Sequence, residues 1–224
     1  MKDKISSIIA VVLLLGLCGC AVFFGARTVL RRSDAVNPKD GWKIAEEKGS
    51  WITGKAVGAT DEVYLVKHTM CYVIPTAKEH YYFAELTDAS GNPYLVTIRA
   101  DKSWYRKNFD ENGYAKNEDG VTVTGYVRTI SGKFRTDIQR QASGWGVSQF
   151  VPTVYVDLLA FRHGIFLIII GAFPLLLALV IFIFSRIGSL ENGFNSTPGK
   201  VFFSVFLVVF LAYLGLLVHT VAML

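Results

Sequence analysis

Three long apolar runs constrain this chain more than any other feature. They cover residues 5–26, 164–185 and 201–224, and none of them contains Asp, Glu, Lys or Arg. A helix needs roughly 20 residues to cross about 30 Å of hydrocarbon, and each run is long enough. The sequence therefore predicts three transmembrane helices, with the lipid bilayer as the first partner of the protein.

The runs divide the chain into three parts. Residues 1–32 form an amino-terminal transmembrane signal-anchor, residues 33–160 a polar soluble domain, and residues 161–224 a transmembrane helical hairpin. The sequence Leu17-Cys18-Gly19-Cys20 is similar to a bacterial lipoprotein cleavage box, with Cys20 as the acylated residue. Because the apolar run continues past Cys20 to Arg27, we expect a retained anchor, and cleavage with lipidation at Cys20 stays open as the alternative.

The net charge of +5 belongs to the membrane boundaries. Segment 33–160 holds 15 Lys/Arg and 16 Asp/Glu and so has a formal charge of −1. Nucleic-acid binding by a whole domain requires an excess of basic residues that can neutralise phosphates. The polar segment lacks that excess, so we expect no nucleic-acid partner.

The short segments that flank the runs predict the orientation. The amino-terminal tail and the loop 186–200 share one side of the membrane and hold four basic residues, whereas the chain after the third run holds none. Lys and Arg in short segments favour the cytoplasmic side. We therefore predict a multi-pass cell-membrane protein whose soluble domain is extracytoplasmic.

The polar segment shows mostly β-type patterning. Tyr94, Val96 and Ile98 alternate with Leu95 and Thr97, as expected for a strand with one buried face. The predicted strands are 51–57, 63–68, 70–74, 81–87, 94–99, 121–130 and 153–159. Residues 58–61 resemble a hairpin connection between the first two strands, and Pro75 is expected to end the strand 70–74.

Two short helices are expected among these strands. Asp101 is placed to cap a helix whose Trp104, Tyr105 and Phe109 plug one end of the sheet. Ser131 is placed to cap a second helix. The spacing of its apolar residues predicts a buried face made of Phe134, Ile138 and Ala142.

The order of these elements resembles an OB-fold, a small Greek-key barrel with a helix between its third and fourth strands. The resemblance implies an α+β membrane protein with a five- to six-stranded OB-like β-barrel inserted between the first and second of three transmembrane helices. The amino-terminal half of the polar segment contains one predicted strand more than an OB-fold has there. In this comparison the second strand is therefore a combination of 63–74 and 81–87. The segments from Asp101 to Phe109 and from Val121 to Val127 also resemble segments of small uncharacterised membrane proteins of Gram-positive bacteria. This second resemblance implies no activity.

No motif for catalysis or cofactor binding stands out. The ligand types His68, Cys71 and His80 fall short of the paired, four-ligand pattern of a structural zinc site. The chain has no Gly-x-Ser-x-Gly elbow and no phosphate-binding Gly-Lys-Ser/Thr loop. We therefore predict a non-enzymatic protein with no catalytic residues, no metal and no cofactor.

Binding is the function that remains. OB-like barrels bind through strands two and three and through the loops after strands one and four. The resemblance implies that the candidate ligand or partner contacts are Tyr72, Arg135, Arg140 and Trp145. The leading hypothesis is a domain that contacts a protein, a second copy of the chain or an envelope glycan, in the manner of an accessory subunit. The alternative is a cytoplasmic-facing domain that binds nucleic acid or a small ligand at the membrane surface.

Overall fold

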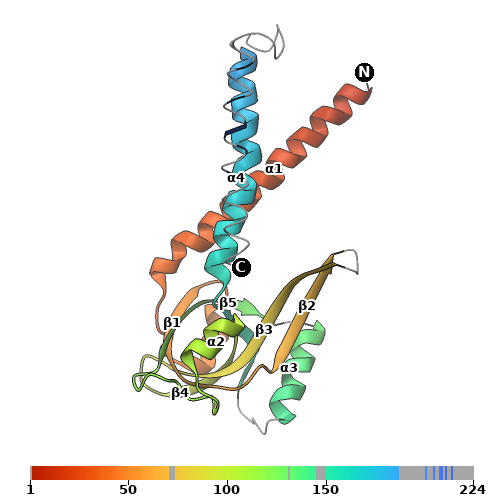
Figure 1. The fold of residues 1–224 in the computed structure, drawn as a ribbon. Coiled ribbons are helices and arrows are strands. Elements are labelled where there is room, and N and C mark those ends of the chain that lie inside the picture. Colours follow the sequence, from red (N-terminus) through yellow and green to blue (C-terminus); the bar gives the residue numbers. More distant parts are fainter. Residues whose placement is uncertain are drawn as a thin grey trace. The chain divides into compact units, whose positions relative to one another are not determined.

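The computed structural model of the chain is a mixed α+β protein (Figure 1). It describes residues 2–70, 74–130, 132–144 and 150–186, together with residues 200, 204, 207, 208, 210 and 213. The elements in chain order are α1 (Lys2–Leu30), η1 (Arg31–Asp34), η2 (Gly41–Glu47), β1 (Trp51–Ala59), β2 (Tyr64–Met70), β3 (Ile74–Thr87), β4 (Pro93–Ala100), α2 (Lys102–Asn108), β5 (Val121–Thr129), α3 (Gly132–Gly144), β6 (Val151–Asp157) and α4 (Ala160–Arg186).

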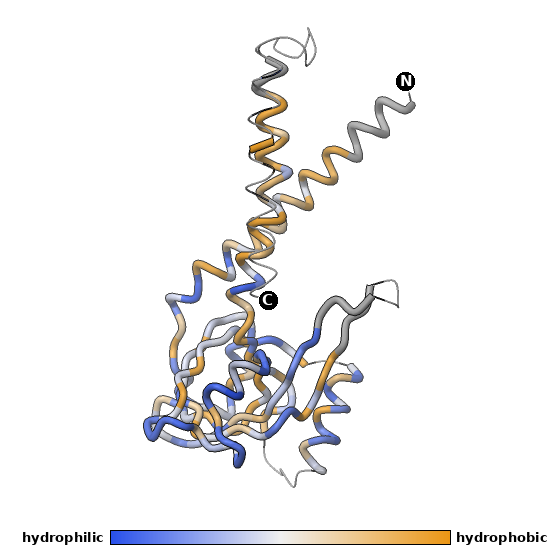
Figure 2. The backbone as a smooth tube through the Cα atoms, in the orientation of Figure 1, coloured by the Kyte–Doolittle hydropathy of each residue, from blue (hydrophilic) through white to orange (hydrophobic). Residues whose placement is uncertain are grey.

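The chain forms two compact units. One contains Met1–Leu30 with Phe161–Leu224, and the other contains Arg31–Ala160. In the first unit α1 and α4 are both continuous helices coloured as hydrophobic over most of their described length (Figure 2). The described residues contain two helices long and apolar enough to cross a membrane. The predicted third run, 201–224, lies almost entirely outside the described residues.

Glycines bring α1 and α4 into close contact. A Cβ atom added at Gly171 would lie 2.5 Å from the carbonyl oxygen of Cys18, and one added at Gly25 would lie 2.6 Å from that of Gly164. Small residues allow this approach because no side chain separates the two backbones. Gly164 and Gly171, seven residues apart on α4, both lie at the contact.

The second unit contains a six-stranded sheet in the order β1-β5-β6-β4-β3-β2, with an additional pairing of β1 with β3. Neighbours are antiparallel except β4 and β6, which are parallel. The predicted hairpin between the first two strands is wrong, because β1 pairs with β5 and β3 and β2 pairs with β3. β1 pairs with β5 from Trp51 to Ala56 and with β3 from Lys55 to Ala59, and the pairing with β3 has a register shift between Ala56 and Gly58.

Pro75 does not end a strand, contrary to the prediction. It lies inside β3, which continues to Thr87. The pairing of β3 with β4 begins only at His80, so Pro75 is paired with β2 alone, next to a register shift. A proline is tolerated there because its missing N–H falls outside the doubly paired part of the sheet.

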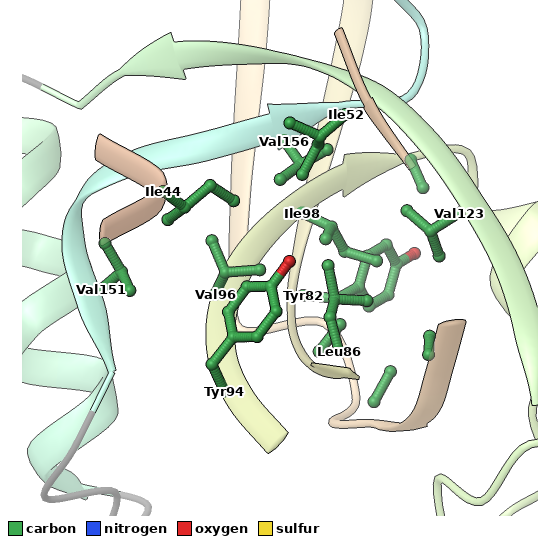
Figure 3. Close-up of a cluster of buried hydrophobic side chains, with 14 of the residues drawn as sticks. Ile44, Ile52, Tyr82, Leu86, Tyr94, Val96, Ile98, Val123, Val151 and Val156 are labelled. Atoms are coloured by element: carbon green, nitrogen blue, oxygen red, sulfur yellow. The ribbon is translucent and has the colours of Figure 1, made fainter. Parts of the chain in front are cut away.

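The main core fills the inner face of the sheet (Figure 3). Ile44 from η2 is fully buried, and the labelled side chains in Figure 3 converge from β1, β3, β4, β5 and β6. The predicted aromatic plug is confirmed, since Tyr105 and Phe109 belong to this core and Trp104 packs against it. Asp101 stands at the N-cap of α2, but its side chain makes no capping hydrogen bond, so that part of the prediction is wrong.

A smaller cluster lies on the other face of the sheet, beneath α3. Ile138 and Ala142 are buried there and Phe134 is half-buried, as the spacing predicted. They pack with Tyr81, Phe83 and other side chains of the sheet. Ser131, the predicted cap of this helix, lies outside the described residues.

Candidate functional site

A concave site lies where the carboxyl end of β1 meets α2 and the loop that follows α2. Its volume is about 330 Å³. We call it the acidic hollow, and it is lined by Gly58, Ala59, Thr60, Asp61, Phe83, Glu85, Leu95, Tyr105, Glu111, Asn112, Gly113 and Tyr114. These residues mix apolar rings with carboxylates and an amide, which is the composition usual for a small binding site.

The loop beside the acidic hollow is fixed by its own hydrogen bonds. One carboxylate oxygen of Asp110 accepts the backbone N–H groups of Asn112 and Tyr114 at 2.9 and 2.8 Å. The Gly113 carbonyl accepts the N–H of Ala59 at 2.8 Å, which joins the loop to β1. Gly113 has φ +82°, and a Cβ atom there would lie 2.2 Å from the carbonyl oxygen of Ala59. The chain therefore needs glycine at this position to hold the loop against β1.

Negative charge dominates the acidic hollow. Asp61 lies in the turn after β1, Glu85 on β3 and Glu111 in the loop after α2, and all three residues line the hollow. No hydrogen bond or ion pair from these three carboxylates to another described residue is present, and the described lining includes no Lys or Arg. An incoming cation would therefore not have to displace an existing partner.

Tyr105 lines the acidic hollow as a buried core residue that is 9% exposed and stacks with Phe109 as well as with Tyr82. Its ring stacks on that of Tyr82 with centroids 4.8 Å apart and planes inclined by 4°. Burial and the nearby carboxylates of Asp61 and Asp110 raise the pKa of its phenol, so this group stays neutral at ordinary pH.

A second hollow of about 580 Å³ shares Asp61, Tyr105 and Glu111 with the first and is also lined by basic residues.

A row of alternating charges crosses four strands elsewhere on the sheet. We call it the charge row, and it consists of Arg128 on β5, Asp157 on β6, Arg99 on β4 and Glu79 on β3. Asp157 Oδ2 lies 2.7 Å from Arg128 Nε and 3.3 Å from Arg99 Nη1, and its Oδ1 accepts the N–H of Leu159 at 3.1 Å. Because every charge has an opposite partner, the charge row acts as a structural device at the end of β6.

The structure separates the residues that the sequence singled out. Arg135 and Arg140 are exposed on α3, and Arg140 lies 3.6 Å from Asp137 of the same helix. Tyr72 and Trp145 lie outside the described residues, so their predicted contacts stay predictions. Neither Arg135 nor Arg140 is among the described residues that line the acidic hollow.

Sequence reasoning missed the residues of the acidic hollow. Asp61, Glu85 and Glu111 are far apart in the chain and belong to no recognisable motif. The one available signal was the acidic character of the turn after β1 and of the loop after α2. That signal gave no reason to place the two segments together.

Two further findings bear on the chemistry of the chain. Within the described part of the structure, no group of three or more His, Cys, Asp or Glu side chains is arranged to hold a metal ion, and Cys71 lies outside that part. Comparison of the chain with protein-family models, with curated proteins and with solved structures gave no match.

Proposed function

We propose that this protein is a non-enzymatic membrane-anchored interaction module, whose extracytoplasmic domain contacts a protein or an envelope glycan. The observation that carries the proposal is the acidic hollow, a concave surface whose carboxylates have no partner among the described residues. Such a surface combines apolar contact with a few polar groups that fix orientation. In this role the protein is an accessory subunit that holds a partner at the membrane.

The strand pairings support an OB-like barrel as the scaffold of the module. The pairs β1–β3, β3–β4, β4–β6, β6–β5 and β5–β1 form a closed cycle of five strands. The helix α2 lies between β4 and β5 in the chain, which corresponds to the helix between strands three and four of an OB-fold. In this comparison β2 is the extra strand, added at the edge of β3.

Membrane anchoring through three spans is part of the proposal. Its support is the length and apolar character of α1 and α4, together with the third apolar run in the sequence. The extracytoplasmic side is favoured by the basic residues in the short flanking segments.

The orientation is tested by labelling intact cells. Glu118 is exposed in the loop before β5, so the variant Glu118→Cys, with the three native cysteines replaced by Ser, carries one accessible thiol in the domain. We expect reaction with a membrane-impermeant maleimide. Protection that disappears on cell lysis would place the domain in the cytoplasm and contradict the proposal.

The interaction is tested on the full chain purified in mild detergent. We expect a particle whose mass exceeds that of one chain in its micelle. The triple variant Asp61→Asn, Glu85→Gln, Glu111→Gln should lose the bound component, whereas the control Glu118→Gln, Asp119→Asn, which alters exposed acids outside the acidic hollow, should retain it. A wild-type monomer without bound protein or glycan would overturn the proposed function.

Exposed basic residues on α3 favour the alternative, a cytoplasmic-facing domain that binds nucleic acid or a small ligand at the membrane surface. Lys133, Arg135 and Arg140 are all exposed there. The nucleic-acid form requires binding of a single-stranded oligonucleotide that weakens steeply with added salt. Binding of that kind, together with protection of the E118C variant in intact cells, would replace the leading proposal.

A further inference from the structure

The hairpin of β2 and β3 extends past the other strands of the sheet (Figure 1). β3 pairs with β2 from Ile74 to Tyr81, but it pairs with β4 only from His80 onward. Residues 74–79 of β3 therefore have a neighbouring strand on one side only. Because a strand rises about 3.3 Å per residue, this part of the hairpin projects roughly 20 Å beyond the last pair of β3 with β4.

The hairpin projects in the direction in which the chain leaves the domain. Arg99 of β4 pairs with Asp157 of β6 on one side and with Tyr81 of β3 on the other. β4 and β6 are parallel, and β3 is antiparallel to both. The part of β3 that precedes Tyr81 therefore continues along the direction in which β6 ends.

The hairpin is also long enough to reach a bilayer that begins at the second apolar run. β6 ends at Asp157, α4 begins at Ala160, and the uncharged run begins at Gly164. The chain from Asp157 to Gly164 covers at most about 16 Å, because its first three residues span up to about 10 Å and four helical residues add about 6 Å. A projection of roughly 20 Å exceeds that distance.

The composition of the hairpin matches the edge of a membrane. Residues 69–77 are mostly apolar and contain no charged residue. At the base of this stretch Lys67 and Lys78 are paired directly opposite each other, and the adjacent carboxylate of Glu79 lies 2.8 Å from Arg99. Like charges in such a cross-strand pair are destabilising. Anionic lipid headgroups relieve that repulsion, and they attract basic residues at the membrane surface.

We propose that the distal part of this hairpin lies in the interface of the bilayer, with the pair of Lys67 and Lys78 at the level of anionic lipid headgroups. The distal part comprises residues 69–70 and 74–77, on either side of a turn that lies outside the described residues. The inference rests on the membrane anchoring in the proposed function and adds a peripheral lipid contact to it. A domain held only by its two chain connections can tilt, and a third point of contact fixes its orientation on the membrane.

The experiment places a fluorescent label on the full chain in vesicles of phosphatidylcholine and phosphatidylglycerol. Ile74→Cys, with the three native cysteines replaced by Ser, carries a nitrobenzoxadiazole label at the distal part of the hairpin, and lipids with a nitroxide on the upper acyl chain quench it. The control Ser90→Cys places the label in the exposed turn at the opposite end of β3. We expect the label at position 74 to be quenched at least about threefold more strongly than the label at position 90, because an interfacial segment reaches the upper acyl region.

The headgroup contact is tested by removal of its charges. Lys67→Gln with Lys78→Gln, in the chain labelled at position 74, should weaken the lipid-bound state of the hairpin roughly fivefold for each lysine removed. Quenching of this variant should no longer depend on phosphatidylglycerol. The matched control Lys102→Gln with Lys107→Gln alters two exposed lysines of α2 and should be quenched like the wild type. Tryptophan fluorescence shows that each variant is folded, and Met70→Cys, directly across the hairpin, gives a second label position.

Flotation of the labelled chain with the vesicles separates this inference from the anchoring on which it rests. A chain that floats, but whose labels at positions 70 and 74 are quenched no more than the label at position 90, would overturn the inference and leave the anchoring standing. Emission that is blue-shifted without quenching would also overturn it, because the hairpin would then be covered by protein. A chain that does not float would overturn the anchoring itself.

Discussion

Replacement of Asp157 tests whether the charge row holds the sheet together. The side chain of Asp157 is 0% exposed and contacts two arginines, and one of these, Arg99, is itself only 11% exposed. In Asp157→Ala, Arg99 keeps its contact with Glu79 at 2.8 Å but loses its second carboxylate, and its buried Nε already lacks a partner among the described residues. Arg128 is 40% exposed and regains water.

The expected loss of stability in Asp157→Ala follows from the exposure of these side chains. Removal of one member of a buried ion pair costs about 3–5 kcal/mol, and the lower end applies here because Glu79 remains and Arg128 reaches solvent. A loss of about 3 kcal/mol lowers the melting temperature of a unit of this size by roughly 10 °C. The isosteric change Asp157→Asn retains an acceptor for the N–H of Leu159, so we expect a smaller decrease, about half as large.

Tryptophan fluorescence during thermal unfolding of the full chain in detergent measures this effect. All tryptophans belong to the polar unit, so the signal does not report on α1 or α4; they are Trp42, Trp51, Trp104 and Trp145. The control Asp119→Asn makes the same chemical change as Asp157→Asn, but at an exposed position. It should leave the transition within about 2 °C of the wild type. An Asp157→Ala transition that matches the wild type would refute the reasoning.

Three further predictions concern acid stability and glycine packing. Asp88 accepts hydrogen bonds from the N–H groups of its own turn and from the N–H of Gly41, and these bonds lower the pKa of its carboxyl. The stability that the carboxylate contributes is therefore present above its unfolded pKa and is lost as the pH falls through its folded pKa. Asp88→Asn should reduce the acid dependence of the fluorescence transition. Gly41→Ala would place a Cβ atom 1.9 Å from the ring of Tyr94 and should destabilise the polar unit by about 1–3 kcal/mol, measured by the same fluorescence assay. Gly171→Leu should separate α1 from α4, because even a Cβ atom there would lie 2.5 Å from the Cys18 carbonyl oxygen. Spin labels at the exposed positions Leu17 and Leu176 should then report a longer distance between the two helices than in the wild type.

Each of these changes has an internal control. An Asp88→Asn chain that keeps the full acid dependence would show that other carboxyls are responsible. Gly144→Ala and Gly16→Leu are matched controls for the two glycines, since no described residue beyond the local helix lies within 4 Å of a Cβ built at either position. If Gly41→Ala were as stable as Gly144→Ala, or Gly171→Leu left the spin-label distance at its Gly16→Leu value, the packing argument would be wrong.

Much of the local structure follows from the sequence alone. The uncharged runs specify α1 and α4, because the pattern is long and each residue contributes to it independently of the rest of the fold. Alternation in 94–99 and the four-residue spacing in α3 predict which side chains are buried, since the period of a strand or helix is a property of its own backbone. Of the binding residues inferred from the barrel resemblance, Arg135 and Arg140 fall on α3 and are not among the described residues that line the hollow, and Tyr72 and Trp145 lie outside the described residues.

The tertiary structure alone decided the pairing of the strands and the sites that this pairing creates. Asp61, Glu85 and Glu111 meet because β1 bends at a register shift and pairs with β3, and because the loop after α2 bonds back to β1. Alternation tells which face a residue occupies but carries no information about which strand lies beside it or in which register. The long apolar helices and the buried faces of single elements can therefore be predicted from the sequence, whereas the acidic hollow and the charge row form only when the fold brings distant segments together.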